Sequence, residues 1–466
     1  MNFLEKMRAQ KRKELAQKKI RMPIGALLEK VHRADRSFGK SLKVSKGTVA
    51  LIAEFKKNSP SKGKINNSAS LKQYMPIYDK YATAISILTE EKYFGGKIEY
   101  LKEARKYTNK PLLRKDFILD SYQIYEARAN GADAILLICG FIPLAKLKQL
   151  VKISSSLGMD SLVECDSEST LKDALQSGSD IIGINTRNLK TLKEDFSSFF
   201  KIAKKIPKKV RKKITLVCES GIYSARQIKE LEGICDAALI GTSIMSSPVP
   251  QVKLREFAQK PLIKICGITA KKDALLAVQY GADVIGLNFY KKSPRYINVE
   301  RAKEIAKAVK GKCLVCGVFV NEKITKVKKI SQKIGLDMLQ FSGDESAQYF
   351  KNASNDFSGS IIKAVHIKDK NSIGQINNYG NADIMLDSFS AGYGGSGKRF
   401  DTKLLDAKKL TGKNIIFSGG LNANNVAGII KRFRPFMVDV CSGVEKFPGK
   451  KSNSKMREFC KIVEGF

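Results

Sequence analysis

Histidine, proline and long apolar runs are all scarce in this sequence. Only 2 of the 466 residues are histidines, and none of the Cys/His spacings typical of zinc fingers occurs. The 12 prolines, together with a hydrophobic content of 43%, predict a globular and mostly ordered chain rather than a disordered one. No stretch of about twenty apolar residues is present, so the sequence predicts no transmembrane helix.

The N-terminal segment lacks the apolar core of a secretory signal. Charged side chains occur throughout residues 1–21, whereas a signal peptide needs a continuous apolar stretch. The 9 cysteines fall mostly in apolar, strand-like segments, as expected for reduced thiols rather than for a disulfide framework. We therefore expect a soluble, cytoplasmic protein.

Cys313 and Cys316 form a C-x-x-C pair without the context of a metal or redox site. Side chains three positions apart in an extended segment point to opposite faces. No second cysteine pair accompanies them, and histidine is nearly absent. We expect no metal or redox site here.

Acidic residues are few relative to basic ones. The chain has 84 Lys and Arg against 45 Asp and Glu, a net charge of +39, which favours polyanionic partners. Lysines recur every few residues along helix-like segments, for example at Lys326, Lys329 and Lys333, the pattern of solvated outer faces. The densest run, residues 204–213, is interpreted as a solvated loop. Nucleic-acid binding driven by charge is the alternative, and steeply salt-dependent binding would indicate it.

Short apolar runs of strand length alternate with helical periodicity along the first half of the chain. A helical extension over residues 3–31, broken at Pro23, precedes them. Eight strands, each with a helical partner, in roughly 250 residues predict a (β/α)8 barrel. The expected strands are 49–55, 83–88, 111–117, 134–139, 161–164, 181–185, 214–219 and 237–241.

The same rhythm starts again after the segment 246–250. The sequence therefore predicts an α/β protein made of two tandem (β/α)8 TIM barrels. We expect the first domain to span residues 1–258, including the helical extension, and the second to span residues 259–466. The expected strands of the second barrel are 262–266, 284–289, 313–320, 338–341, 361–365, 384–387, 414–417 and 437–440.

Ionisable and amide side chains gather at the predicted carboxyl ends of the strands, the catalytic rim of such barrels. Glu54 and Lys56 share a face at the end of the first strand because side chains alternate. Single charges at strand ends are often structural, but several on one rim are costly without a ligand. The first half contributes Glu54, Lys56, Lys115, Glu164, Asn185, Arg187 and Glu219, and the second half contributes Cys266, Arg295, Gln340 and Asp387.

A cysteine opposite an aspartate is able to act as a base and acid pair if the pKa of the thiol is lowered. The alternative for Cys266 is a small buried hydrophobic residue.

Small residues follow the seventh and eighth strands of each half. Glycine lets backbone N–H groups approach a phosphate, and a following helix adds a favourable dipole. Each half is therefore expected to bind a sugar phosphate. The candidate residues are Ser220, Gly221, Gly241, Thr242, Gly419, Gly420, Ser442 and Gly443.

These residues lie in motifs that resemble two known families. Residues 1–255 resemble indole-3-glycerol phosphate synthase through the runs Glu54-Phe55-Lys56-Lys57-Asn58-Ser59-Pro60-Ser61, 89–94, 114–117, 183–189 and 219–222. Residues 260–466 resemble phosphoribosylanthranilate isomerase through Lys264-Ile265-Cys266-Gly267-Ile268-Thr269, 293–296, Gly394-Gly395-Ser396-Gly397 and 418–421. The motifs occur in order at the spacing of barrel units, as in the bifunctional enzyme of tryptophan biosynthesis.

The resemblance implies roles for the candidate residues. In the first half, Lys56 would hold the substrate carboxylate, Lys115 would be the general acid and Glu164 the acid/base of the dehydration. Glu54, Ser59, Asn185, Arg187, Glu219 and Ser220 would shape that site. In the second half, Cys266 would be the general base, Asp387 the general acid and Arg295 the partner of the anthranilate carboxylate. Both reactions proceed without a cofactor, and we expect a monomer.

The second half departs from the family pattern at two places. It reads Gln340-Phe341-Ser342-Gly343, where the family usually has Leu-His in place of Phe-Ser, a change that bears on packing of the fourth strand. The segment 387–393 is also longer and less regular than the family pattern. An active synthase with an impaired isomerase half is therefore a second possibility.

Overall fold

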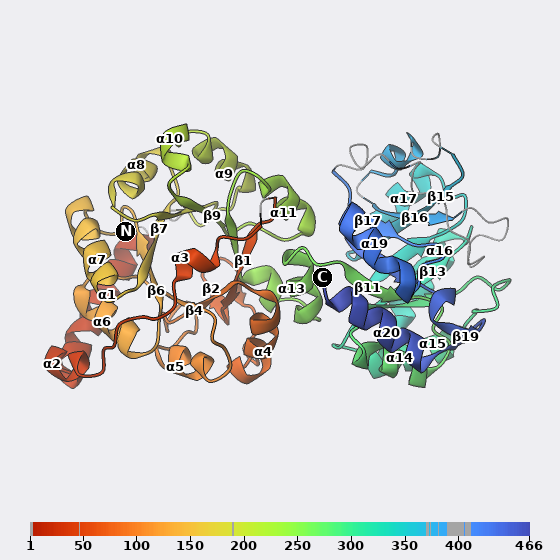
Figure 1. Cartoon of the computed structure of the whole chain (residues 1–466), viewed down its shortest axis with the longest axis horizontal. Helices are drawn as coiled ribbons and strands as arrows, with labels where there is room; N and C mark the ends of the chain where they lie inside the picture. Colours follow the sequence, from red (N-terminus) through yellow and green to blue (C-terminus); the bar gives the residue numbers. More distant parts are fainter. Residues whose placement is uncertain are drawn as a thin grey trace. The chain divides into compact units, whose positions relative to one another are not determined.

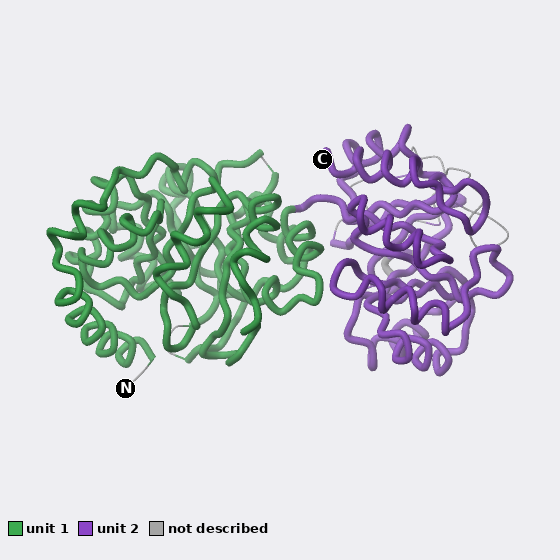
Figure 2. Tube along the Cα trace, turned by 90° about the horizontal axis from the view of Figure 1, so that it is seen from below, with its two compact units in different colours: residues 1–258 green, residues 259–466 purple. Residues whose placement is uncertain are grey.

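The computed structural model describes residues 3–45, 47–188, 191–369, 372, 374–380, 382–388, 405 and 412–466. The chain divides into two compact units, Met1–Ala258 and Gln259–Phe466, which are coloured separately in Figure 2. Each unit contains a closed barrel of eight parallel strands (Figure 1), which confirms the prediction of two (β/α)8 barrels.

The barrel of unit 1 closes in the order β1-β10-β9-β8-β7-β6-β5-β4. Every strand that the sequence predicted is present within two residues of its expected bounds. The strands are β1 (Ala50–Phe55), β4 (Ala84–Leu88), β5 (Leu112–Lys115), β6 (Ala134–Ile138), β7 (Asp160–Cys165), β8 (Ile181–Asn185), β9 (Thr215–Glu219) and β10 (Ala237–Ile240).

Helices surround this barrel and follow its strands in sequence. A short hairpin of β2 (Asn58–Ser59) and β3 (Gly63–Lys64) follows β1. The helices are α4 (Leu71–Tyr81), α5 (Glu99–Arg105), α6 (Ser121–Ala129), α7 (Leu144–Ser156), α8 (Glu168–Gln176), α9 (Phe196–Ala203), α10 (Lys208–Arg211), α11 (Ala225–Leu231), α12 (Thr242–Met245) and α13 (Pro250–Phe257).

The basic run 204–213 is not the plain loop that we predicted, because it contains the one-turn helix α10. Pro207 precedes that helix with φ of −59°, a value that its ring fixes and that leads readily into a helix. Arg211 at the other end of α10 pairs with Asp236 at 2.9 Å.

Alternation along β1 sends its apolar and charged side chains in opposite directions. The Phe55 ring packs against Tyr74 of α4 and Tyr100 of α5, with ring centroids 5.8 and 6.0 Å away. Glu54 and Lys56 therefore point into the barrel. The same alternation applies to two neighbouring residues of β5. Arg114 points outward and pairs with Glu126 of α6, whereas Lys115 faces the barrel mouth.

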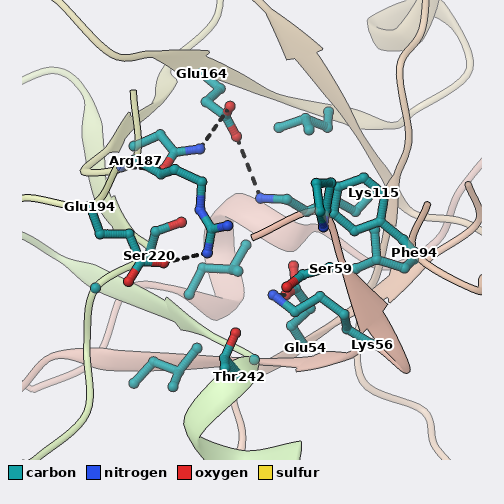
Figure 3. Close-up of a pocket in the computed structure, with 18 of the residues that line it drawn as sticks. Glu54, Lys56, Ser59, Phe94, Lys115, Glu164, Arg187, Glu194, Ser220 and Thr242 are labelled. Atoms are coloured by element: carbon teal, nitrogen blue, oxygen red, sulfur yellow. Dashed lines mark hydrogen bonds and ion pairs between the residues drawn. The ribbon is translucent and has the colours of Figure 1, made fainter. Parts of the chain in front are cut away.

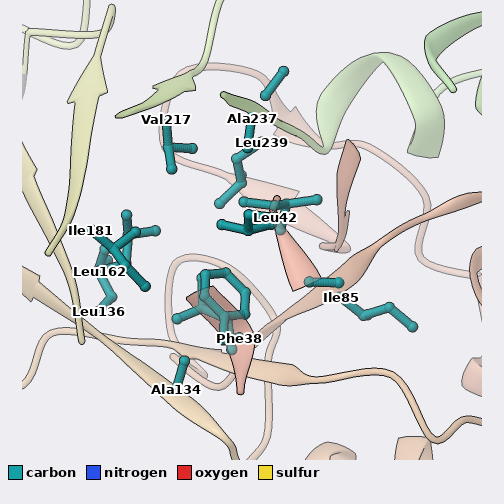
Figure 4. Packing of buried hydrophobic residues seen from close by; sticks show 14 of the residues in the cluster. Phe38, Leu42, Ile85, Ala134, Leu136, Leu162, Ile181, Val217, Ala237 and Leu239 are labelled. Atoms are coloured by element: carbon teal, nitrogen blue, oxygen red, sulfur yellow. The ribbon is translucent and has the colours of Figure 1, made fainter. Parts of the chain in front are cut away.

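The opposite end of the barrel is closed by a short helix and apolar side chains. Helix α3 (Phe38–Ser41) and the residue after it supply Phe38 and Leu42, both fully buried. Figure 4 shows these two side chains among strand residues such as Leu136, Leu162 and Leu239. A packed interior leaves only the carboxyl ends of the strands open to a ligand.

The predicted N-terminal extension forms α1 (Phe3–Arg21) and α2 (Ile24–Leu28), with the break at Pro23 as expected. Lys11 of α1 is buried and pairs with Asp116, which follows β5, at 2.9 Å. Burial opposes the charge on Lys11, but Asp116 and Glu14 outweigh it and raise the pKa of Lys11. Arg8 adds hydrogen bonds to the carbonyls of Gly140 and Phe141. Helix α1 is thus fastened to the end of the barrel at which the strands terminate.

Unit 2 repeats the architecture with the strand order β11-β12-β13-β14-β15-β16-β17-β18. All eight predicted strands are again present within two residues of their expected bounds. They are β11 (Leu262–Ile265), β12 (Val284–Asn288), β13 (Leu314–Phe319), β14 (Met338–Phe341), β15 (Ser360–Ile367), β16 (Asp383–Ser388), β17 (Ile415–Phe417) and β18 (Met437–Val440).

The described helices of unit 2 pack on the outside of its barrel. After β18 the chain makes the 3₁₀ turn η4 (Ser442–Val444) and the hairpin of β19 (Glu445–Phe447) and β20 (Lys450–Lys451). The helices are α14 (Lys271–Gln279), α15 (Val299–Val309), α16 (Ile324–Ile334), α17 (Ala347–Ser354), η1 (Gln375–Tyr379), α19 (Ala423–Phe433) and α20 (Asn453–Glu464). Among the helices described in either unit, none combines the length and hydropathy needed to cross a bilayer.

Replacing Lys11 by methionine should loosen α1 from the barrel. Loss of one partner from a buried ion pair costs about 3 kcal/mol, so amide exchange in α1 should accelerate about 100-fold. Lys205→Met is the matched control because Lys205 and Glu168 form an exposed pair, with side chains 58% and 60% exposed. Hydrogen–deuterium exchange with mass spectrometry on the whole chain measures both. Equal exchange of α1 in the two variants would contradict this anchoring role.

Candidate active sites

A cavity opens at the carboxyl ends of the strands in unit 1, where the sequence predicted a catalytic rim (Figure 3). Its polar wall brings together side chains from β1, β5, β7, β8 and the loops after β9 and β10. Of the predicted residues, those lining the cavity are Glu54, Lys56, Ser59, Lys115, Glu164, Asn185, Arg187, Ser220, Gly221, Gly241 and Thr242. Glu219 lies behind Lys115 and contacts it directly.

Lys115 lies between two carboxylates. Its ammonium group forms a short ion pair with Glu219 and lies 3.5 Å from Glu164. Burial opposes the charge on Lys115, but Glu219, Glu164 and Glu54 outweigh it and raise its pKa. Burial together with Glu164 raises the pKa of Glu219 to about 8 in spite of Lys115. Lys115 therefore keeps its proton, next to a carboxyl group whose pKa is raised toward neutral pH, an arrangement suited to proton transfer.

Glu54 and Lys56 form a second pair on the same wall. Lys56 Nζ lies 2.6 Å from Glu54 Oε2, and Glu54 is only 2% exposed. Burial opposes the Glu54 charge, but Lys56 and Lys115 lower its pKa. Figure 3 shows Lys56 directed toward the cavity. Two ammonium groups in one cavity suit a substrate that carries negative charge.

The third polar group lies at the end of β8. Asn185 donates to Glu164 Oε1 at 3.1 Å and accepts the Arg187 backbone N–H at 2.9 Å. The Arg187 guanidinium pairs with Glu194 and hydrogen bonds Ser61 in the loop after β1. These contacts tie three strand ends together and fix Glu164 against Lys115.

Two turns of small residues in unit 1 line the cavity. Ser220 and Gly221 follow β9 with φ of 68° and 69°, a left-handed conformation that favours glycine. Gly241 precedes α12, whose first residue Thr242 also lines the cavity. Such turns bind anions.

Most of the remaining wall is apolar and suits an aromatic ring. It includes Phe3 from α1, and its residues are Phe3, Pro60, Leu88, Phe94, Phe117, Leu136, Ile138, Leu192, Ile222, Leu239 and Ile240.

A second cavity lies at the corresponding end of the unit 2 barrel. Of the predicted residues, those lining it are Cys266, Arg295, Gln340, Asp387, Gly419, Gly420 and Ser442. Gly443 lies next to Ser442, and a Cβ at this position would collide with the Leu421 carbonyl oxygen. The predicted motif 394–397 and the segment 389–393 lie outside the described residues.

A buried ion pair forms the floor of this second cavity. Lys264 Nζ lies 2.8 Å from Asp439 Oδ1 and donates to Gln340 Oε1 at 2.9 Å. Ser418 donates to the other Asp439 oxygen at 3.0 Å. The floor therefore joins β11, β14, β17 and β18 beneath the cavity.

Cys266 and Asp387 belong to the wall above this floor. The pKa of Cys266 is lowered to about 7 by a hydrogen bond from Cys441 and, against burial, by the charges of Lys264 and Lys451. Burial and Asp439 raise the pKa of Asp387 to about 6. The structure thus eases the ionisation of a thiol at one strand end and lets a carboxyl group at another keep its proton to a higher pH than usual.

Arg295 is held at the cavity wall by Glu445. Its Nε and Nη2 atoms donate to the two Glu445 oxygens at 3.0 and 2.7 Å. Lys451 of β20 also pairs with Glu445 at 2.9 Å. The hairpin β19–β20 therefore positions the arginine, a contact that the sequence did not reveal.

The departure at Phe341 and Ser342 is accommodated within β14. Gln340 donates to Ser342 Oγ at 3.0 Å. The Phe341 ring packs outward against Tyr349 and Phe350 of the α17 segment, with centroids 5.1 and 5.3 Å away. The fourth strand is regular and fully buried.

Several residues around the two cavities were not predicted from the sequence. Lys264 and Asp439 could have been identified from the sequence. Each is a charged residue within a short apolar strand, and such a residue needs a partner inside the barrel. Nothing in the sequence around Glu445 indicated its contact with Arg295. The unpredicted residues are Glu194, Lys264, Asp439, Cys441, Glu445 and Lys451.

Comparison with known proteins assigns the two units to two families. Residues 4–257 match the family described as indole-3-glycerol phosphate synthase. Residues 263–462 match the family described as N-(5'-phosphoribosyl)anthranilate (PRA) isomerase.

Relatives that contain both regions match almost the whole chain. A "Tryptophan biosynthesis protein TrpCF" of Buchnera aphidicola subsp. Schlechtendalia chinensis is 36% identical over 462 residues, 97% of this chain and 96% of the relative. The protein of the same name from Helicobacter pylori strain J99 is 34% identical over 439 residues, 93% of both chains. A solved phosphoribosylanthranilate isomerase from Thermotoga maritima is 38% identical, with a TM-score of 0.42 over 44% of this chain and 100% of that chain. The chain therefore belongs to the indole-3-glycerol phosphate synthase family in its first half and to the PRA isomerase family in its second, in the tandem order of the bifunctional tryptophan-biosynthesis proteins.

Proposed function

We propose that the two units catalyse consecutive steps of tryptophan biosynthesis. Unit 2 converts N-(5-phosphoribosyl)anthranilate to 1-(2-carboxyphenylamino)-1-deoxyribulose 5-phosphate. Unit 1 closes that product to indole-3-glycerol phosphate with loss of CO2 and water. The observation that carries the proposal is the arrangement of acid, base and cation at both barrel mouths, each beside turns suited to a phosphate.

The isomerase step is an internal redox rearrangement that needs a proton donor and a proton acceptor. Asp387 gives a proton to the ribose ring oxygen, which opens the ring. The Cys266 thiolate then removes the proton from the carbon beside the former anomeric centre, and the resulting enolamine rearranges to the ketone. Because Asp387 has a raised pKa and Cys266 a lowered one, each group is partly in its working form near neutral pH. Arg295 pairs with the anthranilate carboxylate, and no cofactor is required.

The synthase step needs an acid at the ribulose carbonyl and a cation near the anthranilate carboxylate. Lys115 is the acid, since its carboxylate partners keep it charged until it donates. Lys56 binds the substrate carboxylate, and its ion pair with Glu54 weakens when it does so. Glu164, placed by Asn185, moves the proton in the dehydration.

The phosphate groups bind at the turns after the last two strands of each barrel. In unit 1 the donors are backbone N–H groups of Gly221 and Thr242, with Ser220 beside them. In unit 2 they belong to Gly419, Gly420 and Ser442.

We assign residues 1–258 to the synthase domain and 259–466 to the isomerase domain. Because each unit has a cavity of its own, we propose that the protein acts as a monomer. We also propose that it acts in the cytoplasm.

An ultraviolet assay of indole formation from phosphoribosylanthranilate, with the purified chain as the only protein, tests the proposal. Lys115→Ala should slow indole formation by about 1,000-fold, as expected for loss of a general acid, and leave the isomerisation intact. Asp387→Ala should do the reverse when the two steps are assayed separately. Lys205→Ala and Asp356→Ala, which change exposed residues, are the matched controls. Loss of both activities in either folded site variant would contradict the two-site assignment.

Alkylation by iodoacetamide should report the thiolate of Cys266. With a pKa of about 7, the rate at Cys266 should rise through a midpoint near pH 7, below the value of about 8.5 for a free cysteine. Lys264→Met removes a positive charge that favours the thiolate, so the midpoint should move to higher pH. Peptide mass spectrometry across a pH series measures both. A wild-type midpoint at or above 8.5 would exclude Cys266 as an activated base.

A further inference from the structure

Cys266 and Cys441 occupy matching positions at the ends of neighbouring strands in unit 2. The register of β11 and β18 pairs Lys264 with Asp439 and Ile265 with Val440, and Cys266 donates its backbone N–H to the Val440 carbonyl at 2.9 Å. The next position on each strand is a cysteine. Adjacent strands lie about 4.8 Å apart, within the Cα separation of 4.4–6.8 Å that a disulfide spans.

Both thiols face the cavity. Lys264 and Asp439 pair inside the barrel two residues earlier, and alternation puts Cys266 and Cys441 on the same inner face. Both cysteines line the cavity wall. The Cys441 Sγ atom lies 2.9 Å from the point where a Cβ on Gly267 would stand, directly beside Cys266. A small solute that enters the cavity therefore meets the two thiols together.

The charges around the pair favour a reactive thiolate. Lys451 Nζ lies 3.9 Å from the Cys441 Sγ atom and donates to the Cys441 carbonyl at 3.1 Å. Together with the hydrogen bond from Cys441, the charge of buried Lys264 lowers the pKa of Cys266 to about 7. Thiolates next to cations are the cysteines that react with peroxides.

We propose that Cys266 and Cys441 form a reversible oxidation site, at which a hydroperoxide converts the two thiols to a disulfide. In the Cys266–Cys441 disulfide, Cys266 is no longer available as a thiolate at the mouth of unit 2. Oxidation therefore stops isomerisation while unit 1 continues to work, a consequence that rests on the proposed role of Cys266 as the base.

The reaction proceeds in two balanced steps. The Cys266 thiolate attacks one peroxide oxygen, the S–O bond forms, the O–O bond breaks and the leaving oxygen departs as water or alcohol after taking a proton. Cys441 then loses its proton and attacks the Cys266 sulfur, so that the S–S bond forms and the hydroxyl of the sulfenic acid leaves as water. Two electrons pass from the two thiols to the peroxide, and a dithiol reverses the change.

Cys316 is the competing partner and supplies the matched control. In the barrel register Gly286 of β12 pairs with Cys316 of β13, and Gly286 occupies the same level as Cys266. Cys316 is therefore two strands from Cys266, about 10 Å away, which is too far for a disulfide without backbone movement. Burial also raises the pKa of Cys316 to about 12.

Unit 1 provides an internal reference for activity. The described residues that line its cavity include no cysteine. The described cysteines of that unit, Cys139, Cys165, Cys218 and Cys235, are buried, and burial raises the pKa of each thiol. The synthase activity should therefore change less than twofold while the isomerase activity falls more than tenfold.

The experiment treats the reduced full-length chain with hydrogen peroxide and follows both activities and the peptide masses. We expect a Cys266–Cys441 cross-link with the loss of two hydrogens, a parallel fall in isomerase activity, and recovery of both with dithiothreitol. Cys316→Ser should behave as the wild type. Cys441→Ser should form no such cross-link, and its Cys266 should progress to sulfinic acid that dithiothreitol does not reverse.

Two outcomes would overturn the proposal: no Cys266–Cys441 peptide in the oxidised wild type, or a Cys266–Cys316 peptide in its place. The cross-link is read by mass and so does not depend on activity. A cross-link that forms without loss of isomerase activity would overturn the inhibitory consequence and the role of Cys266 as base. Absence of isomerase activity in the untreated chain would instead contradict the proposed function, and the mass readout would still decide the oxidation site.

Discussion

The parallel register of a closed barrel is the constraint on which both sites depend. Because neighbouring strands run in the same direction, all of their carboxyl ends meet at one mouth. Because side chains alternate, a residue two places from the end of a strand shares the inner face with the last one. Lys115 meets Glu164 and Glu219 through this arrangement alone, although 49 and 104 residues separate them in sequence.

Both barrels have buried charge at the mouth, and unit 1 has apolar packing at its opposite end (Figure 4). Phe38 and Leu42 close the lower part of unit 1, while Lys115, Glu164 and Glu219 lie at its mouth. Buried ions stabilise a fold little, since desolvation offsets most of their attraction. Their presence in both cavities therefore fits catalysis better than stability. In unit 2 the Lys264–Asp439 pair combines both purposes, since it links two strands and also supplies the charge that favours the Cys266 thiolate.

The sequence predicted all sixteen barrel strands and the placement of most site residues, because both follow from local patterns. Apolar runs bounded by helical periodicity located the strands, and Glu54 and Lys56 were placed on one face by alternation. The contacts between distant segments were not predictable in the same way. Arg295 meets Glu445 150 residues later, and Lys11 of α1 meets Asp116, only after the chain has closed. The Cys266–Cys441 pair also depends on which strands become neighbours, and no local signal marks it. The one-turn helix α10 was missed because the lysines around Pro207 resemble a solvated loop.

The central claim is that two complete sites lie at the mouths of two barrels in one chain. A crystal structure of the whole chain with an unreactive, reduced form of 1-(2-carboxyphenylamino)-1-deoxyribulose 5-phosphate, the proposed product of unit 2 and substrate of unit 1, tests it most directly. The account predicts one ligand in each unit, with phosphates at Gly221 and Thr242 in unit 1 and at Gly419, Gly420 and Ser442 in unit 2. The carboxylates should lie at Lys56 and Arg295. Ligand in only one barrel, or phosphate density away from these turns, would contradict the account.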